Sequence, residues 1–152
     1  MKEVYITIGI PGSGKSTWSN LHFKPQHIVS SDSVRQMLYG TEDVQGGVFT
    51  WDAIYSIARA KIDYHEKIVI DSTAAIRRDR LSVLRIARYS SLLPIKVIAV
   101  VFPVDPETAN KRQELRLRKV PLSVLKRHYD GIRNLTEESL LEEGFDEVLF
   151  VN

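Results

Sequence analysis

The chain has 152 residues, of which 43% are hydrophobic and 26% charged, and it contains no cysteine. This is the usual length and composition of one globular domain, and it excludes a disordered or collagen-like chain, a disulfide framework and a cysteine nucleophile. The net charge of +2 is too small to indicate nucleic-acid binding by itself, and no apolar run approaches the roughly 20 residues that span a bilayer. We therefore expect a single domain over residues 1–152 that is cytoplasmic and has no membrane partner.

Short apolar runs alternate with helical patterns along the whole chain. Strand patterns occupy residues 4–8, 27–30, 67–71, 95–101 and 145–150. Helical patterns begin at residue 16, after Asp32, near residues 48, 81 and 105, and after Pro121. Because continuous apolar strands separated by helices need cover on both faces, the pattern predicts an α/β fold with a parallel sheet.

The first strand pattern ends at a complete phosphate-binding loop, Gly9-Ile10-Pro11-Gly12-Ser13-Gly14-Lys15-Ser16. Its glycines let backbone N–H groups turn toward phosphate oxygens, where a side chain would block the approach. We expect Gly12, Ser13 and Gly14 to surround the phosphates. Lys15 should bridge the β- and γ-phosphates, Ser16 should bind Mg²⁺ and Thr17 should meet the α-phosphate. The loop therefore predicts a phosphotransferase that uses ATP and Mg²⁺, and it does not identify the acceptor.

Two carboxylates follow strands beside this loop, where the groups that orient and deprotonate an acceptor hydroxyl converge in such sheets. We interpret Asp32 as the general base, with Arg35 one helical turn later facing the same acceptor. The alternative for Asp32 is a helix cap. Asp71 either holds a magnesium-bound water from a Walker B position or, with the next two residues, caps the following helix.

Arg112 and Arg116 are spaced i, i+4 and precede a break at Pro121. A pair on one helix face predicts a lid over about residues 112–120, whose arginines would stabilise charge developing on the triphosphate. The alternative is a solvated helix, supported by two Glu-to-basic pairs at the same spacing.

Together these segments resemble the polynucleotide 5′-kinases of phage and bacterial RNA repair. The matching segments are residues 9–17, 31–36 and 71–73, then Lys111-Arg112 with Arg116 and Val120-Pro121. The resemblance implies the P-loop kinase fold, with five strands in the order 2-3-1-4-5, helices on both faces and a helical lid. It implies Lys15 and Ser16 on the donor phosphates and metal and Asp32 as general base. It also implies that Arg35 grips the acceptor's phosphate and that Arg112 and Arg116 are the lid arginines.

The sequence departs from that family at Ala74, where the usual Asp-Thr-Asn or Asp-Ala-Thr-Asn pattern has Asn. The family's phosphatase and nucleotidyltransferase modules have no counterpart here, so we expect neither phosphate removal nor strand sealing.

The leading interpretation is transfer of the γ-phosphate of ATP to the 5′-hydroxyl end of RNA or DNA. The alternatives are a kinase of a small-molecule hydroxyl, such as a nucleoside, sugar or antibiotic, and a nucleotide-dependent regulatory module without turnover.

Trp51 and Tyr55 fit the apolar stripe of their helix, so packing is favoured over stacking on an acceptor base. His22, His27, His65 and His128 lack metal-ligand spacing and are expected at the surface or in packing. The sequence is compatible with a homo-oligomer and does not decide the oligomeric state.

Overall fold

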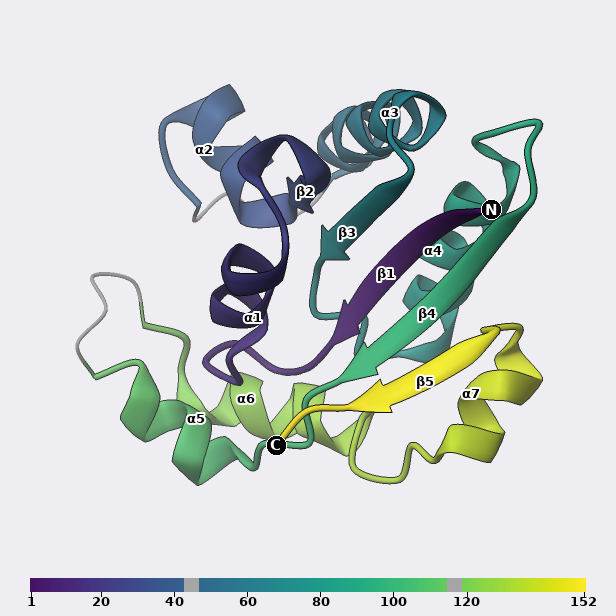
Figure 1. Cartoon of the computed structure of the whole chain (residues 1–152). Coiled ribbons are helices and arrows are strands. Elements are labelled where there is room, and N and C mark those ends of the chain that lie inside the picture. The colour runs from purple at the N-terminus through teal and green to yellow at the C-terminus, as the bar shows by residue number, and fades with distance from the viewer. Residues whose placement is uncertain (43–46, 115–118) are drawn as a thin grey trace.

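The computed structural model describes residues 1–42, 47–114 and 119–152. Its centre is a five-stranded sheet in the order β2-β3-β1-β4-β5, and every neighbouring pair is parallel (Figure 1). The strands are β1 (Lys2–Ile8), β2 (Ile28–Ser30), β3 (Lys67–Asp71), β4 (Ile95–Val101) and β5 (Glu147–Phe150). The predicted α/β fold and strand order are confirmed.

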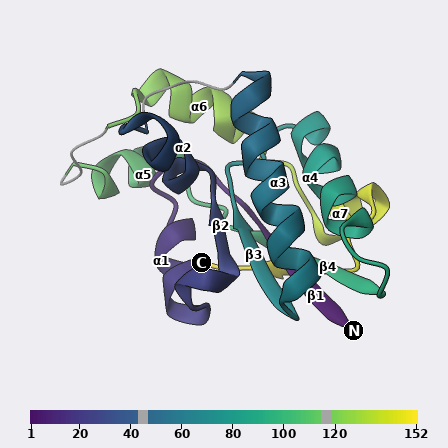
Figure 2. The ribbon, with the colours of Figure 1, turned by 90° about the horizontal axis from the view of Figure 1, so that it is seen from above.

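Helices cover both faces of the sheet, as parallel strands require. They are α1 (Lys15–His22), α2 (Ser31–Tyr39), α3 (Val48–Tyr64), α4 (Arg77–Tyr89), α5 (Pro106–Arg112), α6 (Leu122–Asp130) and α7 (Glu137–Glu143). Seen from above, α3, α4 and α7 lie on one side of the strands and α1 lies on the other (Figure 2). Within the described part of the chain, no helix has the length and apolar character needed to cross a membrane.

The alternation of side chains along the strands builds two cores. Val4, Ile6 and Ile8 of β1 point into the larger core, which lies beneath α3, α4 and α7. Tyr5 points the other way and packs with Trp18 of α1 in the smaller core. Side chains on both faces of β1 are therefore packed against helices, as expected for a strand in the middle of the sheet.

Local signals fix where several helices begin. Ser30 is the N-cap of α2 and its hydroxyl accepts from the Ser33 N–H at 3.2 Å. Helix α7 begins with a capping box between Thr136 and Ser139, and the sequence analysis did not predict this helix. The second strand was expected to start at His27, but that residue closes a short 3₁₀ turn and β2 begins at Ile28.

A buried ion pair joins α4 to α7. The Arg80 guanidinium contacts both carboxylate oxygens of Glu143 at 2.8 Å, and the two side chains are 4% and 7% exposed. The remaining Arg80 nitrogen donates to the carbonyls of Ala74, at 3.2 Å, and Ala75, at 2.8 Å. This arginine therefore fixes both α7 and the loop that follows β3.

Replacing one member of this pair should strongly destabilise the fold. Glu143→Ala leaves the Arg80 guanidinium buried without its counter-charge, so the free energy of unfolding should fall by about 3–5 kcal/mol. Urea denaturation followed by circular dichroism measures this, with the exposed neighbour Glu142→Ala as the control. A loss of less than about 1 kcal/mol in Glu143→Ala, the size expected of a surface pair, would contradict a role for the pair in stability.

Candidate functional site

The loop between β1 and α1 has the backbone that its glycines predict. Gly12 has φ of 83° and Gly14, the N-cap of α1, has φ of 103°. A Cβ on Gly12 would lie 2.6 Å from the carbonyl oxygen of Ala109, which belongs to α5. The loop is therefore wrapped closely by α5, and only glycine fits at position 12 without displacing backbone.

Lys15 is folded against its own loop. Its Nζ donates to the carbonyl oxygens of Gly9, at 2.7 Å, and Ile10, at 3.1 Å, and the residue is 9% exposed. Ser13 is buried, and Thr17 is exposed in the first turn of α1. The loop thus combines a fixed ammonium charge with the amino end of a helix, an arrangement that attracts phosphate.

Asp71 and Ser16, the two residues proposed for the metal, are in direct contact. The Ser16 hydroxyl donates to Asp71 Oδ2 at 2.8 Å, and the Thr7 hydroxyl donates to Asp71 Oδ1 at 3.3 Å. Asp71 is only 6% exposed. Helix α4 begins at Arg77 with Ile76 as its N-cap, so the alternative that Asp71 and its neighbours cap this helix is wrong.

Asp32 and Arg35 lie at the carboxyl end of the neighbouring strand. Ser30, the last residue of β2, is paired with Asp71 of β3, so the first turn of α2 begins next to Asp71. Arg35 contacts Asp32 at 3.3 Å and lies over the Trp51 ring, 5.4 Å from its centroid. The carboxylate side chain is 49% exposed and the guanidinium side chain 13%. The N-cap of α2 is Ser30, so Asp32 lies in the first turn of the helix and is not its cap.

The structure brings one of the two predicted lid arginines to the loop. Arg112 is the last residue of α5, and its guanidinium donates to the Ser13 carbonyl oxygen at 3.1 Å. Arg116 lies outside the described residues. Although Arg112 is 99 positions from Ser13 in the chain, it contacts the phosphate-binding loop, and the lid over about residues 112–120 stays a prediction.

Gln113, which the sequence did not indicate, connects the end of α5 to the chain before α6. Gln113 is 1% exposed, and its amide donates to the Val120 carbonyl at 2.6 Å and accepts from the Val120 N–H at 3.2 Å. These two hydrogen bonds tie the end of α5 to the residues before α6. A glutamine in a polar, charged stretch gives no sequence signal for such a role.

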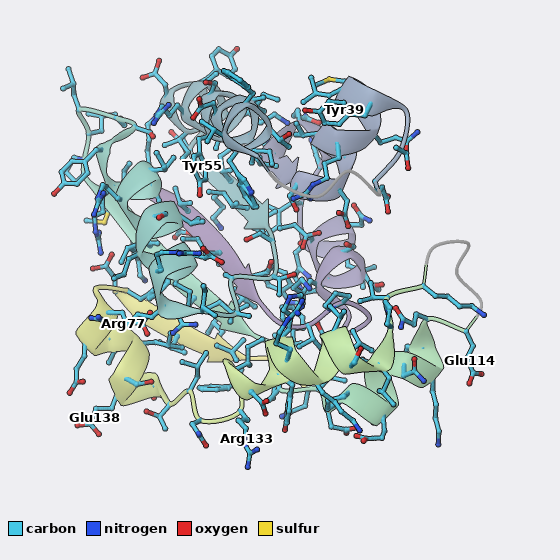
Figure 3. All side chains as sticks on the ribbon, turned by 180° about the vertical axis from the view of Figure 1, so that it is seen from behind. Tyr39, Tyr55, Arg77, Glu114, Arg133 and Glu138 are labelled. Carbon is cyan, nitrogen blue, oxygen red and sulfur yellow. The ribbon has the colours of Figure 1, made fainter. Side chains whose placement is uncertain are left out.

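The aromatic residues of α3 pack against the larger core, as favoured. Trp51 and Tyr55 are half-buried, with ring centroids 5.6 Å apart. Figure 3 shows Tyr55 on the side of α3 that faces the strands. Burial, together with the nearby Asp79 carboxylate, raises the pKa of Tyr55.

The histidines form no metal centre in the described part of the chain, where no group of three or more His, Asp or Glu side chains has a metal-binding arrangement. The rings of His27 and His65 pack edge to face with centroids 4.6 Å apart, as expected for packing residues.

Solved structures share this fold. A chain of the Pnkp1/Rnl/Hen1 RNA repair complex superposes with a TM-score of 0.69 at 22% identity, over 95% of this chain and 46% of that one. A fungal RNA kinase superposes with a TM-score of 0.65 at 16% identity, over 99% of this chain and 74% of that one. A gluconokinase from Sinorhizobium meliloti 1021 superposes with a TM-score of 0.57 at 16% identity, over 98% of this chain and 81% of that one. The chain thus spans about half the length of the RNA repair protein, and at these identities the likeness shows the fold.

A search of curated proteins finds no match. The family model described as an AAA domain matches residues 4–135, which include the loop, both carboxylates and the arginines of α2 and α5. P-loop kinases of this kind use a nucleoside triphosphate with Mg²⁺ for phosphoryl transfer. The chain therefore belongs to the AAA domain family and has the P-loop kinase fold.

Proposed function

We propose that this protein transfers the γ-phosphate of ATP to the 5′-hydroxyl end of RNA or DNA. The observation that carries the proposal is the contact between Asp32 and Arg35 at the carboxyl end of β2, next to Asp71 and the phosphate-binding loop. This contact supports the roles of Asp32 as a base and of Arg35 as a phosphate-binding group on the acceptor side of the donor site.

The donor side fits ATP and Mg²⁺. Mg²⁺ binds proteins through one or two oxygen ligands and keeps waters and substrate phosphates as the others. Ser16 and Asp71 present such oxygens 2.8 Å apart beside Lys15, and they would hold the ion there. When bound, the ion would neutralise charge on the phosphates. Arg112 would add a second positive group from α5.

On the acceptor side, Asp32 acts as the general base. The 5′-oxygen forms a bond to the γ-phosphorus while the bond from that phosphorus to the bridging oxygen of ADP breaks. The hydroxyl proton passes to the Asp32 carboxylate. Since the chemistry of phosphoryl transfer is mostly positioning and charge stabilisation, a half-exposed carboxylate beside the loop is suited to orient the hydroxyl.

Arg35 supports an acceptor that carries its own phosphate. Its guanidinium is held between the Asp32 carboxylate and the Trp51 ring, so little conformational freedom is lost when it binds an anion. A nucleotide with a 3′-phosphate offers such an anion next to its 5′-hydroxyl. The RNA kinase and RNA repair neighbours agree with this acceptor, whereas the gluconokinase favours the small-molecule alternative.

The direct test incubates the protein with γ-labelled ATP, Mg²⁺ and 5′-hydroxyl oligonucleotides, beside a panel of nucleosides and sugars. We expect label on the oligonucleotides. Asp32→Ala should keep ATP binding and lose transfer by at least ~10²-fold, while Asp63→Ala, an exposed carboxylate of α3, should match the wild type. Label on sugars alone would overturn the acceptor, and full turnover in Asp32→Ala would overturn the base.

Adding a single methyl group at Gly12 tests whether the loop is the ATP site. Gly12→Ala should weaken ATP binding by at least about tenfold, because the added Cβ meets the Ala109 carbonyl at 2.6 Å and must displace the loop or α5. Isothermal titration measures the affinity. Gly40→Ala is the matched control, since Gly40 also has positive φ, of 73°, but nothing lies within 4 Å of its Cβ position. Equal ATP affinity in both variants would count against the loop as the ATP site.

Arg35→Ala separates phosphate recognition from hydroxyl recognition. Loss of a charge-assisted hydrogen bond of about 1.5–3 kcal/mol should raise the acceptor KM roughly 10- to 100-fold for a 3′-phosphorylated mononucleotide. The KM for the matching nucleoside should change much less. Steady-state kinetics with the two acceptors measures this difference, and an equal rise for both would contradict phosphate binding by Arg35.

A further inference from the structure

The last turn of α5 lies along the phosphate-binding loop. The Arg112 guanidinium donates to the Ser13 carbonyl oxygen at 3.1 Å, and its Nη1 atom lies 3.8 Å from the position that a Cβ on Gly14 would occupy. One turn earlier on α5, the Ala109 carbonyl oxygen lies 2.6 Å from the corresponding position on Gly12. This end of the helix therefore brings a guanidinium directly to the loop.

Helix α5 is too short to hold this position by itself. It has seven residues, Pro106–Arg112, and a helix of that length is unstable in water without contacts to the rest of the fold. Its first turn is capped by Asp105, whose carboxylate accepts from the Thr108 N–H at 2.8 Å. Arg112 lies at the other end, where the last carbonyl groups have no partner within the helix. The direction of its side chain therefore depends on what holds this end.

Gln113, the C-cap of α5, supplies that contact. Its backbone N–H donates to the Ala109 carbonyl oxygen at 3.2 Å, the same oxygen that lies against Gly12. Its side chain is buried and binds both backbone groups of Val120, and its nitrogen also donates to the Asn110 side chain at 3.3 Å. Both ends of the amide group therefore have partners in the protein.

Val120 is a firm anchor for this amide. It is partly buried against the larger core, and the next residue, Pro121, is the N-cap of α6. Helix α6 is fixed in turn by the fully buried Leu125, and it packs against α5 (Figure 1). Gln113 thus joins the end of α5 to a part of the chain that the core holds in place.

We propose that Gln113 is a positioning residue that holds the Arg112 guanidinium at the loop for contact with the phosphates of ATP. The buried amide of Gln113 is not available to a ligand, so it acts by fixing the backbone of the adjacent arginine. A guanidinium that is already held in place loses less conformational freedom when it binds an anion. The inference rests on the proposed function in requiring that ATP binds at the loop and that Arg112 meets its phosphates, and it requires no particular acceptor.

The test is a double-mutant cycle on the affinity for ATP with Mg²⁺, measured by isothermal titration. Arg112→Ala should weaken binding at least about tenfold, because a charge-assisted hydrogen bond to a phosphate is lost. Gln113→Ala should cause a loss of similar size. Since both changes remove the same interaction, the double variant should bind no more weakly than Arg112→Ala alone. Losses that multiply in the double variant, or wild-type affinity in either single variant, would overturn the proposal.

Two further variants separate this role from a general loss of structure. Gln113→Met keeps the length and volume of the side chain without its amide, so it should fold and bind ATP as weakly as Gln113→Ala. Thr136→Ala also removes a hydrogen bond between a side chain and the backbone at a helix end, in the capping box of α7, and should bind ATP like the wild type. Circular dichroism checks the fold of each variant. Equal affinities in Gln113→Met and Thr136→Ala would contradict a specific role for the amide.

Hydrogen exchange provides a measurement on the unmodified sequence. The Val120 N–H, which donates to Gln113 Oε1 at 3.2 Å, should be protected in the free protein. Because ATP favours the conformation in which Arg112 is held at the loop, Mg²⁺ with a non-hydrolysable ATP analogue should slow the exchange of this N–H several-fold. A Val120 N–H that exchanges freely, or at a rate that the nucleotide does not change, would count against the proposal.

These affinities do not depend on the acceptor, so the two proposals can fail separately. The expected cycle together with labelling of sugars alone would reject the polynucleotide acceptor and keep the role of Gln113. Labelling of oligonucleotides together with losses that multiply would keep the polynucleotide acceptor and reject the role of Gln113.

Discussion

The site depends on the hydrogen bonds of the Asp71 carboxylate, because they join the sheet to the phosphate-binding loop. It accepts hydrogen bonds from Thr7 on β1 and Ser16 on α1. This geometry follows from strand register, which pairs Ile6 with Ile70 and so brings the ends of β1 and β3 together. A shift of β3 by one residue would turn Asp71 to the other face of the sheet, and the Ser16 hydroxyl would lose its partner.

Most of the fold could be predicted because its signals are local. Continuous apolar strands and a glycine-rich turn into α1 are visible in the sequence, and the strand order followed from the family resemblance. Helix α7 was missed because its seven residues, EESLLEE, are too short to show a clear helical period. Its place depends on the Arg80–Glu143 pair, which joins residues 63 positions apart. Contacts of that range have no local signature.

The candidate site likewise contains residues with a local sequence signal and residues without one. Lys15 and Ser16 are recognisable from the loop motif, and Ser16 contacts Asp71 at the end of β3. A residue whose role depends on burial was not found: Gln113 binds both backbone groups of Val120 and so ties the end of α5 to the residues before α6. Its side chain is buried, and the burial of one polar side chain cannot be derived from a sequence.

Donor and acceptor recognition rest on different parts of the chain, which explains why the fold leaves the acceptor open. In the proposed function the ATP side is built largely from backbone and from residues next to the loop, and the fold that carries it is shared by an RNA kinase and a gluconokinase, each 16% identical to this chain. The acceptor side is built from side chains of α2 and α3. There the contact with Asp32 uses one of the five N–H donors of Arg35, and the guanidinium lies over the Trp51 ring. A planar cation held in this way recognises a phosphate better than an uncharged sugar hydroxyl, so the proposed acceptor depends on how Arg35 is held.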